Sequence, residues 1–126
     1  MKVKIDTKEK FHVITLMESI VAANIAADLS QLVTKFLHAE IKSVVLNLSA
    51  VVSIDEQAAE ELSRLQQQFY ENSASFVICS LKPEAEAQLE KYDLLEMMNI
   101  TPTESEAWDI VQMEEIEREL LDDEED

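Results

Sequence analysis

The order of apolar and polar positions along the chain predicts strands that alternate with helices. Two short apolar runs at Val3–Ile5 and Phe11–Leu16, separated by polar residues, predict an opening β-hairpin. Residues 43–48 (SVVLNL) form a short, β-branched and almost wholly apolar run, which is typical of a central strand covered on both faces. Ser75–Ser80 predicts a second buried strand, and Asn99–Thr101 lies where a last edge strand would fall.

Four other segments have apolar residues three and four positions apart, as amphipathic helices do. The first is Asn24–Ala39, with its first residue as the expected N-cap. The second follows Asp55, the expected N-cap of the next helix, and the third is Pro83–Glu90, because proline suits a first helical turn. Thr103 and Glu106 match a Thr-x-x-Glu capping box at the start of the fourth helix.

These elements predict a single α/β or α+β domain, with a mixed sheet of four to five strands and about four helices packed against it. The chain has 126 residues, 47% of them apolar, which suits one hydrophobic core. We expect the domain to occupy residues 1–113 and the acidic end of the last helix to follow at 114–126. The run of like charge at Asp122–Asp126 is expected to be disordered.

Charge and glycine content exclude several classes of function. The formal net charge is −17, of which residues 114–126 carry −8, so we expect neither nucleic acid nor an anionic membrane surface as a partner. The chain contains no glycine, which phosphate-binding loops of the P-loop and Rossmann types require. Two histidines and one cysteine, without HExxH or CxxC spacing, predict no metal site, and no cofactor is expected.

The residue content also indicates where in the cell the protein is located and whether it is an enzyme. Cys79 is the only cysteine and is expected to be a core residue, so no internal disulfide can form; no leader is evident, and a cytoplasmic location is expected. No apolar run reaches the ~20 residues of a membrane span, so direct membrane insertion is not expected. No side chains form a recognisable acid–base arrangement, which favours a protein-binding module over an enzyme.

The stretch Val44–Leu62 (VVLNLSAVVSIDEQAAEEL) resembles the signature region of STAS domains, the fold of bacterial anti-sigma factor antagonists. In that family a strand reading roughly "vvlDLs" leads through "xVxxID" into "SSGL", and Leu46–Ser49 with Ile54–Asp55 hold the equivalent places. Val13–Ile20 resembles the second strand and its exit, and Thr103–Ala107 the start of the last helix. The resemblance implies a regulatory protein-interaction domain whose partner is a serine-kinase-like anti-sigma factor or another signalling protein.

The chain departs from the family at the position of its regulatory switch. In the antagonists two hydroxyl residues and a glycine follow the aspartate, and a serine kinase phosphorylates the second hydroxyl. Here Glu56 and Gln57 fill the hydroxyl positions and Ala58 replaces the glycine, so Gln57 cannot accept a phosphate. Glu56 is either a permanent phosphate-like charge or an ordinary acidic residue of a first helical turn.

The resemblance places the partner-binding surface on the loop and first turns around Asp55. The residues that we expect to contact a partner are Ser53, Asp55, Glu56, Gln57, Ala58 and Glu60. Ser49 and Ser53 retain hydroxyls in this loop; they are candidate phosphosites, although hydrogen bonds to the loop backbone are the simpler interpretation.

Two alternative functions stay open at this point. The same fold serves in some families as a cytoplasmic subunit that regulates an ABC-type lipid transporter. A phosphoacceptor receiver domain is another small acidic α/β protein, but Asn47 and Leu48 end the central strand where its aspartate would be required. The apolar group at residues 94–98 is expected to belong mainly to the core, and an exposed part of it would favour a homodimer.

Overall fold

The computed structural model describes the backbone of residues 1–125 and the side chains of residues 1–121. Its main sheet has five strands in the order β1-β2-β4-β6-β7. The strands are β1 (Val3–Thr7), β2 (Phe11–Leu16), β4 (Ser43–Asn47), β6 (Phe76–Cys79) and β7 (Ile100–Thr101). β1 runs antiparallel to β2, and all other neighbours are parallel, which confirms the predicted mixed sheet.

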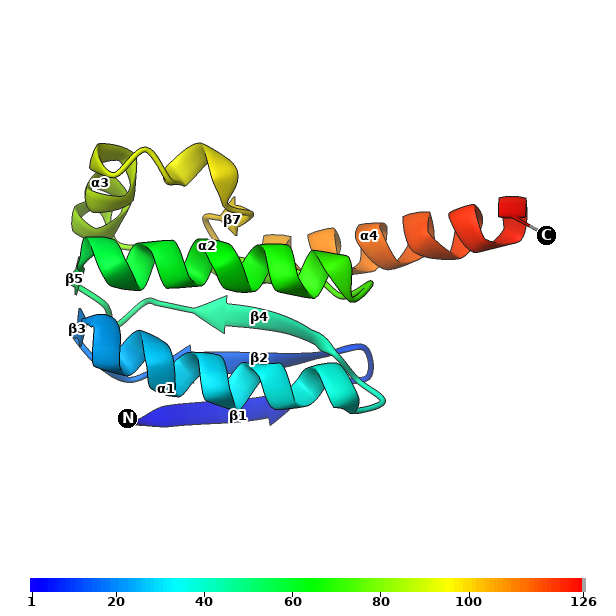
Figure 1. The fold of residues 1–126 in the computed structure, drawn as a ribbon, viewed down its shortest axis with the longest axis horizontal. Helices are drawn as coiled ribbons and strands as arrows, with labels where there is room; N and C mark the ends of the chain where they lie inside the picture. Colours follow the sequence, from blue (N-terminus) through cyan, green and yellow to red (C-terminus); the bar gives the residue numbers. More distant parts are fainter. Residues whose placement is uncertain (126) are drawn as a thin grey trace.

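Helices cover both faces of this sheet (Figure 1). They are α1 (Ala23–Thr34), which continues into the 3-10 turn η1 (Lys35–His38), α2 (Glu56–Glu71), α3 (Pro83–Lys91) and α4 (Glu104–Glu125). α1, α2 and α3 share one apolar core with the sheet, while α4 packs on the opposite face. A strand that must bury both faces has to be apolar throughout, and the four residues of β6 are all buried.

The core on the α1–α2 face is the larger of the two. Fully buried side chains from β2, β4 and β6, including Leu16, Leu46 and Ile78, pack there against Leu29 of α1 and Leu62 of α2. The opposite core is small: Phe11, Val13, Val45, Val77 and Cys79 of the sheet meet Ala107 and Val111 of α4. The predicted core position of Cys79 is therefore confirmed.

Two details differ from the sequence-based expectations. Residue Ala22 is the N-cap of α1 and makes no side-chain cap bond, so the prediction of Asn24 as the cap is wrong; Asn24 lies inside the first turn. A second, two-stranded sheet pairs β3 (Ile20–Val21) with β5 (Ser53–Ile54) in parallel. Strands of two residues are too short to give a periodic signal, which is why the sequence predicts only a loop at β5.

Helix α4 extends well past the end of the sheet (Figure 1). Thr103 accepts a hydrogen bond from the Glu106 N–H at 3.2 Å, as expected of the predicted capping box. Lys10 pairs with Glu115, and the Arg118 guanidinium donates to the Ser75 hydroxyl at 3.2 and 3.3 Å, so contacts with the body continue beyond residue 113. The predicted disorder at 122–126 concerns the end of this helix: the described backbone is helical through Glu125, and Asp126 lies outside the described residues.

Candidate docking site at the start of helix α2

The candidate site lies at the carboxyl edge of the parallel strands. A parallel strand is followed by a crossover helix, so successive helices must begin at the edge where the strands end. Here α1, α2 and α3 follow β3, β5 and β6, and the small β3–β5 sheet lies beside the start of α2 (Figure 1). The chain topology therefore brings the predicted Asp55 loop next to segments that are distant in sequence.

Asp55 caps α2 as the sequence predicts. Its backbone is extended, with φ −78° and ψ 168°, and its carboxylate Oδ1 accepts a hydrogen bond from the Ala58 N–H at 2.8 Å. The Asp55 N–H donates in turn to the Val21 carbonyl at 3.1 Å. These bonds fix both sides of the residue, so the first turn of α2 has a defined position relative to β3.

The strand before Asp55 is held from the other side by α3. Gln88 accepts from the Ile54 N–H at 2.6 Å, and the Tyr92 hydroxyl donates to the Ile54 carbonyl at 3.1 Å. Gln88 also donates through Nε2 to the Ser53 hydroxyl at 3.4 Å. Because Gln88 of α3 and Tyr92, the C-cap residue of that helix, bond to both backbone groups of Ile54, the loop that leads to Asp55 is held in place here.

An exposed apolar group lies beside this braced loop. Met17, Ile20 and Val52 are 56, 63 and 46% exposed. Two segments adjoin here: the Val52 N–H donates to the Ser19 carbonyl at 2.7 Å, and Ile20 is paired with Ser53 in the β3–β5 register. Met17 belongs to the first segment and lies shortly before Ile20 in the chain. The sequence did not single out this group, although apolar residues in loops and at the start of a short strand are a signal that could have indicated it.

The predicted partner-binding residues lie around this group with different accessibilities. Asp55, Glu56, Gln57 and Glu60 are exposed, and Ser53 is half-buried. Ala58 is fully buried, so its side chain lies in the core and offers no surface to a partner. Ser53 and Asp55 thus border the apolar group, with the carboxylates of Glu56 and Glu60 one turn apart along α2.

Gln57 faces another part of the surface. It lines a shallow hollow of about 400 Å³ between α1 and α2, together with Ala23, Ala27, Ser30, Gln31, Glu61 and Arg64. Glu61 and Arg64 form an ion pair within α2. The small and neutral side chains of α1 in this hollow are further candidate contact residues that the sequence did not single out.

The two serines of the loop differ in their surroundings. Ser49 is exposed, and its backbone N–H donates to the Asn47 side chain at 2.9 Å. Ser53 is half-buried, and its hydroxyl accepts from Gln88. The expectation that this hydroxyl bonds to the loop backbone is therefore incorrect, because α3 supplies a side-chain partner that a local reading of the loop could not reveal.

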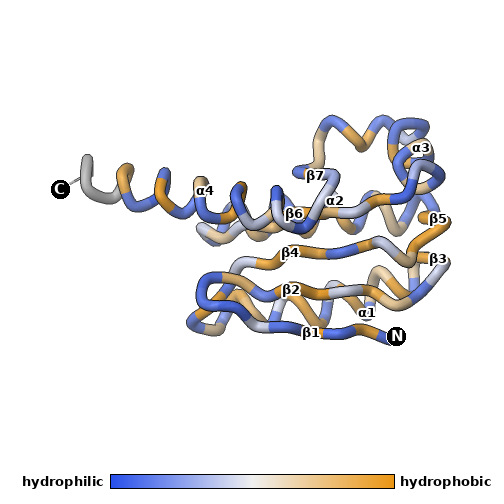
Figure 2. Tube along the Cα trace, turned by 180° about the vertical axis from the view of Figure 1, so that it is seen from behind, coloured by the Kyte–Doolittle hydropathy of each residue, from blue (hydrophilic) through white to orange (hydrophobic). Residues whose placement is uncertain are grey.

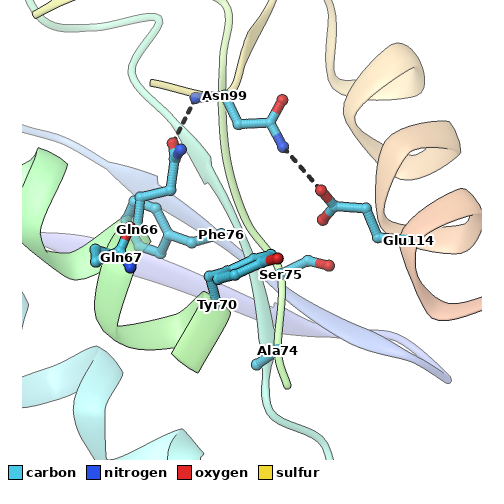
Figure 3. A pocket seen from close by; sticks show the side chains of 8 residues that line it. All are labelled: Gln66, Gln67, Tyr70, Ala74, Ser75, Phe76, Asn99 and Glu114. Atoms are coloured by element: carbon cyan, nitrogen blue, oxygen red, sulfur yellow. Dashed lines mark hydrogen bonds between the residues drawn. The ribbon is translucent and has the colours of Figure 1, made fainter. Parts of the chain in front are cut away.

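A separate pocket of about 200 Å³ lies between α2, β6 and α4 (Figure 3). Gln66 accepts from the Asn99 N–H, and the Asn99 side chain donates to the Glu114 carboxylate at 3.5 Å. These two hydrogen bonds connect α2 to α4 through Asn99. These polar groups of the pocket are therefore paired with one another. Its α2 residues, from Gln66 onward, lie more than two helical turns past the start of α2 at Glu56.

The part of the chain that the structure describes offers neither a metal-binding cluster nor a helix suited to cross a membrane. No group of three or more His, Cys, Asp or Glu side chains there could hold a metal ion. Within the same residues, none of the helices has the length and apolar character that crossing a bilayer demands.

Comparison with known proteins places this geometry in a family. The model of the STAS domain matches residues 2–107. No curated protein sequence matches the chain. Among the solved structures that share the fold at low identity are an anti-sigma factor antagonist, a variant of RsbS and part of an anion transporter.

An anti-sigma factor antagonist from Mycobacterium paratuberculosis is 15% identical, with a TM-score of 0.74 and coverage of 88% of this chain and 93% of that one. A variant of RsbS from Moorella thermoacetica with glutamate in place of a serine is 18% identical, with a TM-score of 0.73 and coverage of 89 and 96%. The murine anion transporter solute carrier 26 family member A9 is 13% identical, with a TM-score of 0.66; the match covers 82% of this chain and 18% of the transporter.

The family model spans most of the chain, and the solved structures reproduce the observed arrangement of strands and helices. This chain belongs to the STAS domain family.

Proposed function

We propose that this chain is a non-enzymatic, cytoplasmic protein-interaction domain that acts as an anti-sigma factor antagonist does. It binds a protein partner through a surface that we call the docking face: Met17, Ile20, Val52, Ser53, Asp55, Glu56 and Glu60. Gln57 lines the neighbouring hollow between α1 and α2. The observation that carries the proposal is the exposed apolar group of Met17, Ile20 and Val52 beside the braced start of α2. An apolar centre with a polar rim on a rigid support is the usual composition of a protein interface.

The charges of the docking face indicate the character of the partner. Asp55, Glu56 and Glu60 are exposed carboxylates, and the chain as a whole is strongly acidic. A basic patch on the partner would complement them, and complementarity of this kind mainly sets association rate and specificity. The partner is a regulatory protein with such a patch, for which a serine-kinase-like anti-sigma factor is the leading candidate.

The docking face works without the usual phosphate switch at Gln57, because an amide has no hydroxyl to modify. Glu56 instead places a fixed carboxylate in the first turn of α2, and it either mimics the phosphorylated state or only complements the helix dipole. The substitution Glu56→Gln distinguishes these two roles. If Glu56 mimics a phosphate, the variant should bind the partner with a different affinity; if it only complements the helix dipole, the variant should lose a little stability and bind as the wild type does.

If phosphorylation does regulate the chain, we propose Ser49 as the acceptor ahead of Ser53. Ser49 is exposed, whereas Ser53 is half-buried and its hydroxyl is engaged by Gln88. Intact-mass measurement of the protein purified from its source cells, followed by peptide mapping, tests this assignment. Phosphate on Ser53 with Ser49 unmodified would contradict it.

Regulation of an ABC-type lipid transporter is the alternative. The likeness to one domain of an anion transporter supports only the statement that this fold also occurs within membrane transport proteins. The two functions predict different partners for the same docking face. Recovery of transporter subunits would favour the alternative, and recovery of a signalling kinase would favour the antagonist-like role.

The experiment is affinity capture from source cells with matched variants of the tagged chain. Ile20→Gln removes an apolar side chain from the docking face, and Met97→Gln removes one that is equally exposed, 64 against 63%, but lies outside it. We expect one set of partners to be recovered by the wild type and by Met97→Gln and to be lost with Ile20→Gln. Equal recovery by all three baits would rule out the docking face.

A further inference from the structure

The outer face of α4 carries an apolar stripe that no described part of the chain covers. Met113, Ile116 and Leu120 are 60, 56 and 58% exposed. Figure 2 shows that apolar positions continue to recur along α4 where it extends past the sheet. Scattered single apolar residues are normal on a surface, but three on one helix face at spacings of three and four are not scattered.

Contacts on the other side of α4 establish which way the stripe faces. Ala107 and Val111 are fully buried against the sheet, and Arg118 reaches inward to the Ser75 hydroxyl. Successive residues of an α-helix are about 100° apart, which places 107, 111 and 118 within one sector. The same geometry places Met113, Ile116 and Leu120 on the opposite side of the helix, directed away from the body.

The charges along the stripe have one sign. The charged residues beside it with described side chains are Glu106, Asp109, Glu117 and Glu119, and all four are exposed. Arg118, the basic residue of this helix, points to Ser75 and does not offset them. The stripe is therefore an apolar strip with carboxylates along both sides.

This charge pattern decides which partner fits. Two copies of the chain pairing through the stripe would place carboxylate against carboxylate in both parallel and antiparallel arrangements, which opposes association. A helix with its own apolar stripe and flanking lysines or arginines would bury the three side chains and pair its charges at once. Helix-on-helix recognition of this kind uses anchors three and four residues apart, as the stripe has.

We propose that α4 is a second docking surface, formed by Met113, Ile116 and Leu120 with their acidic flanks, and that it binds a cationic amphipathic helix of a protein partner. The surface is separate from the docking face and goes beyond the function proposed above. It gives the domain two contact surfaces, so that one chain can hold two segments of a regulatory complex.

The test uses a synthetic amphipathic peptide of about three heptads, with leucines at the a and d positions and lysines elsewhere. The control peptide has the same leucines and glutamates in place of the lysines. Binding to the isotopically labelled full chain is followed by NMR chemical-shift titration and by calorimetry. We expect the lysine peptide to bind, with the largest shifts at residues 113–120, and the glutamate peptide not to bind.

Variants of the chain separate the stripe from general attraction to an acidic protein. Ile116→Gln with Leu120→Gln should weaken binding about tenfold or more, because the apolar anchors are lost while the charge is unchanged. Leu120→Gln alone should weaken it less, and it serves as the readout if the double variant does not fold. Ile20→Gln, in the docking face, should bind the peptide as the wild type does, so failure of the proposed function would not affect this result.

Three outcomes would overturn the proposal. Equal binding by the wild type and the double variant would mean that charge alone attracts the peptide. If the glutamate peptide bound as tightly as the lysine peptide, charge complementarity would not select the partner. A dimer of the wild type in sedimentation that becomes monomeric in the double variant would show that a second copy covers the stripe.

Discussion

Asp55 has two roles at the residue scale, because it ends the loop of the docking face and begins α2. Its carboxylate satisfies the Ala58 N–H, one of the helix-terminal donors that otherwise lack a partner. The same carboxylate is exposed and available to a basic partner. A substitution at this position can therefore change stability and binding separately, depending on whether the hydrogen bond or the charge is lost.

Replacing Asp55→Ala should lower the free energy of unfolding by about 1 kcal/mol, because the cap bond is lost. Asp55→Asn keeps an N-cap acceptor without the charge and should leave stability nearly unchanged while weakening partner binding. Urea unfolding of the three proteins measures the first effect, and affinity capture measures the second. Equal stability of Asp55→Ala and the wild type would show that the cap bond contributes nothing.

Cys79 gives a second prediction at this scale. Burial raises the pKa of its thiol above the ordinary value of 9.0; the Glu104 carboxylate adds to this, and a hydrogen bond from Ser80 opposes it. Because the pKa of this thiol is higher in the folded protein than in the unfolded chain, the unfolded chain loses the thiol proton at lower pH. Stability from this group is thus complete below pH 9.0 and declines as pH rises above it.

Cys79→Ala has no proton to lose and should not show this decline. The difference in unfolding free energy between the wild type and Cys79→Ala should therefore shrink between pH 8 and pH 10. Denaturant titrations of both proteins at several pH values measure it. A difference that stays constant over this range would contradict the burial argument.

At the scale of elements, α3 holds the docking face in place through a contact that is remote in sequence. Gln88 and Tyr92 bond to the two backbone groups of Ile54, and Gln88 also reaches Ser53. The Ile54 side chain is fully buried. Loss of the Gln88 acceptor would therefore leave a backbone N–H without its partner in a largely enclosed position.

Gln88→Ala should cost about 1–3 kcal/mol and should raise the rate of amide exchange at Ile54. Gln68→Ala is a matched control, because it shortens an exposed glutamine of α2 that has no described contact with this loop. Hydrogen exchange followed by NMR reports the Ile54 amide directly. Unchanged protection in Gln88→Ala would mean that the β3–β5 pairing alone holds the loop.

Long periodic elements were predictable from sequence, and short ones were not. The six-residue strand β2 and the capped helix α2 have strong patterns, and both were placed as the structure has them. The two-residue strands β3 and β5 exist because their backbones pair with each other, and pairing between distant segments leaves no local signal. The Asn24 cap was wrong for a related reason, since the N-cap of α1 lies two residues earlier, directly after β3.

The candidate site was predictable to a similar extent. Asp55, Glu56, Gln57 and Glu60 lie at the N-cap and in the first turns of a single helix, so a family motif could place them close together in the fold. The apolar group of Met17, Ile20 and Val52 comes from separate loops that the β3–β5 pairing brings together. Ala58 was expected at the surface, and its burial shows that the motif identifies a position in sequence but not the direction of each side chain.

At the scale of the whole molecule, the chain combines one STAS domain with an acidic surface and a long final helix. The docking face lies at one end of the sheet, where α2 begins, and α4 extends past the other end (Figure 1). The two proposed surfaces would allow one chain to contact two protein segments at once. Strong negative charge favours basic partners at both surfaces and disfavours self-association.

Hydrogen–deuterium exchange can show whether a bound partner covers the docking face. The chain is measured alone and in complex with the partner recovered by affinity capture. We expect slower amide exchange at residues 17–21 and 52–60 in the complex than in the free chain. The Ile20→Gln variant should form no complex, and the exchange of these segments should then stay unchanged. Protection confined to other parts of the chain, with both of these segments unchanged, would contradict it.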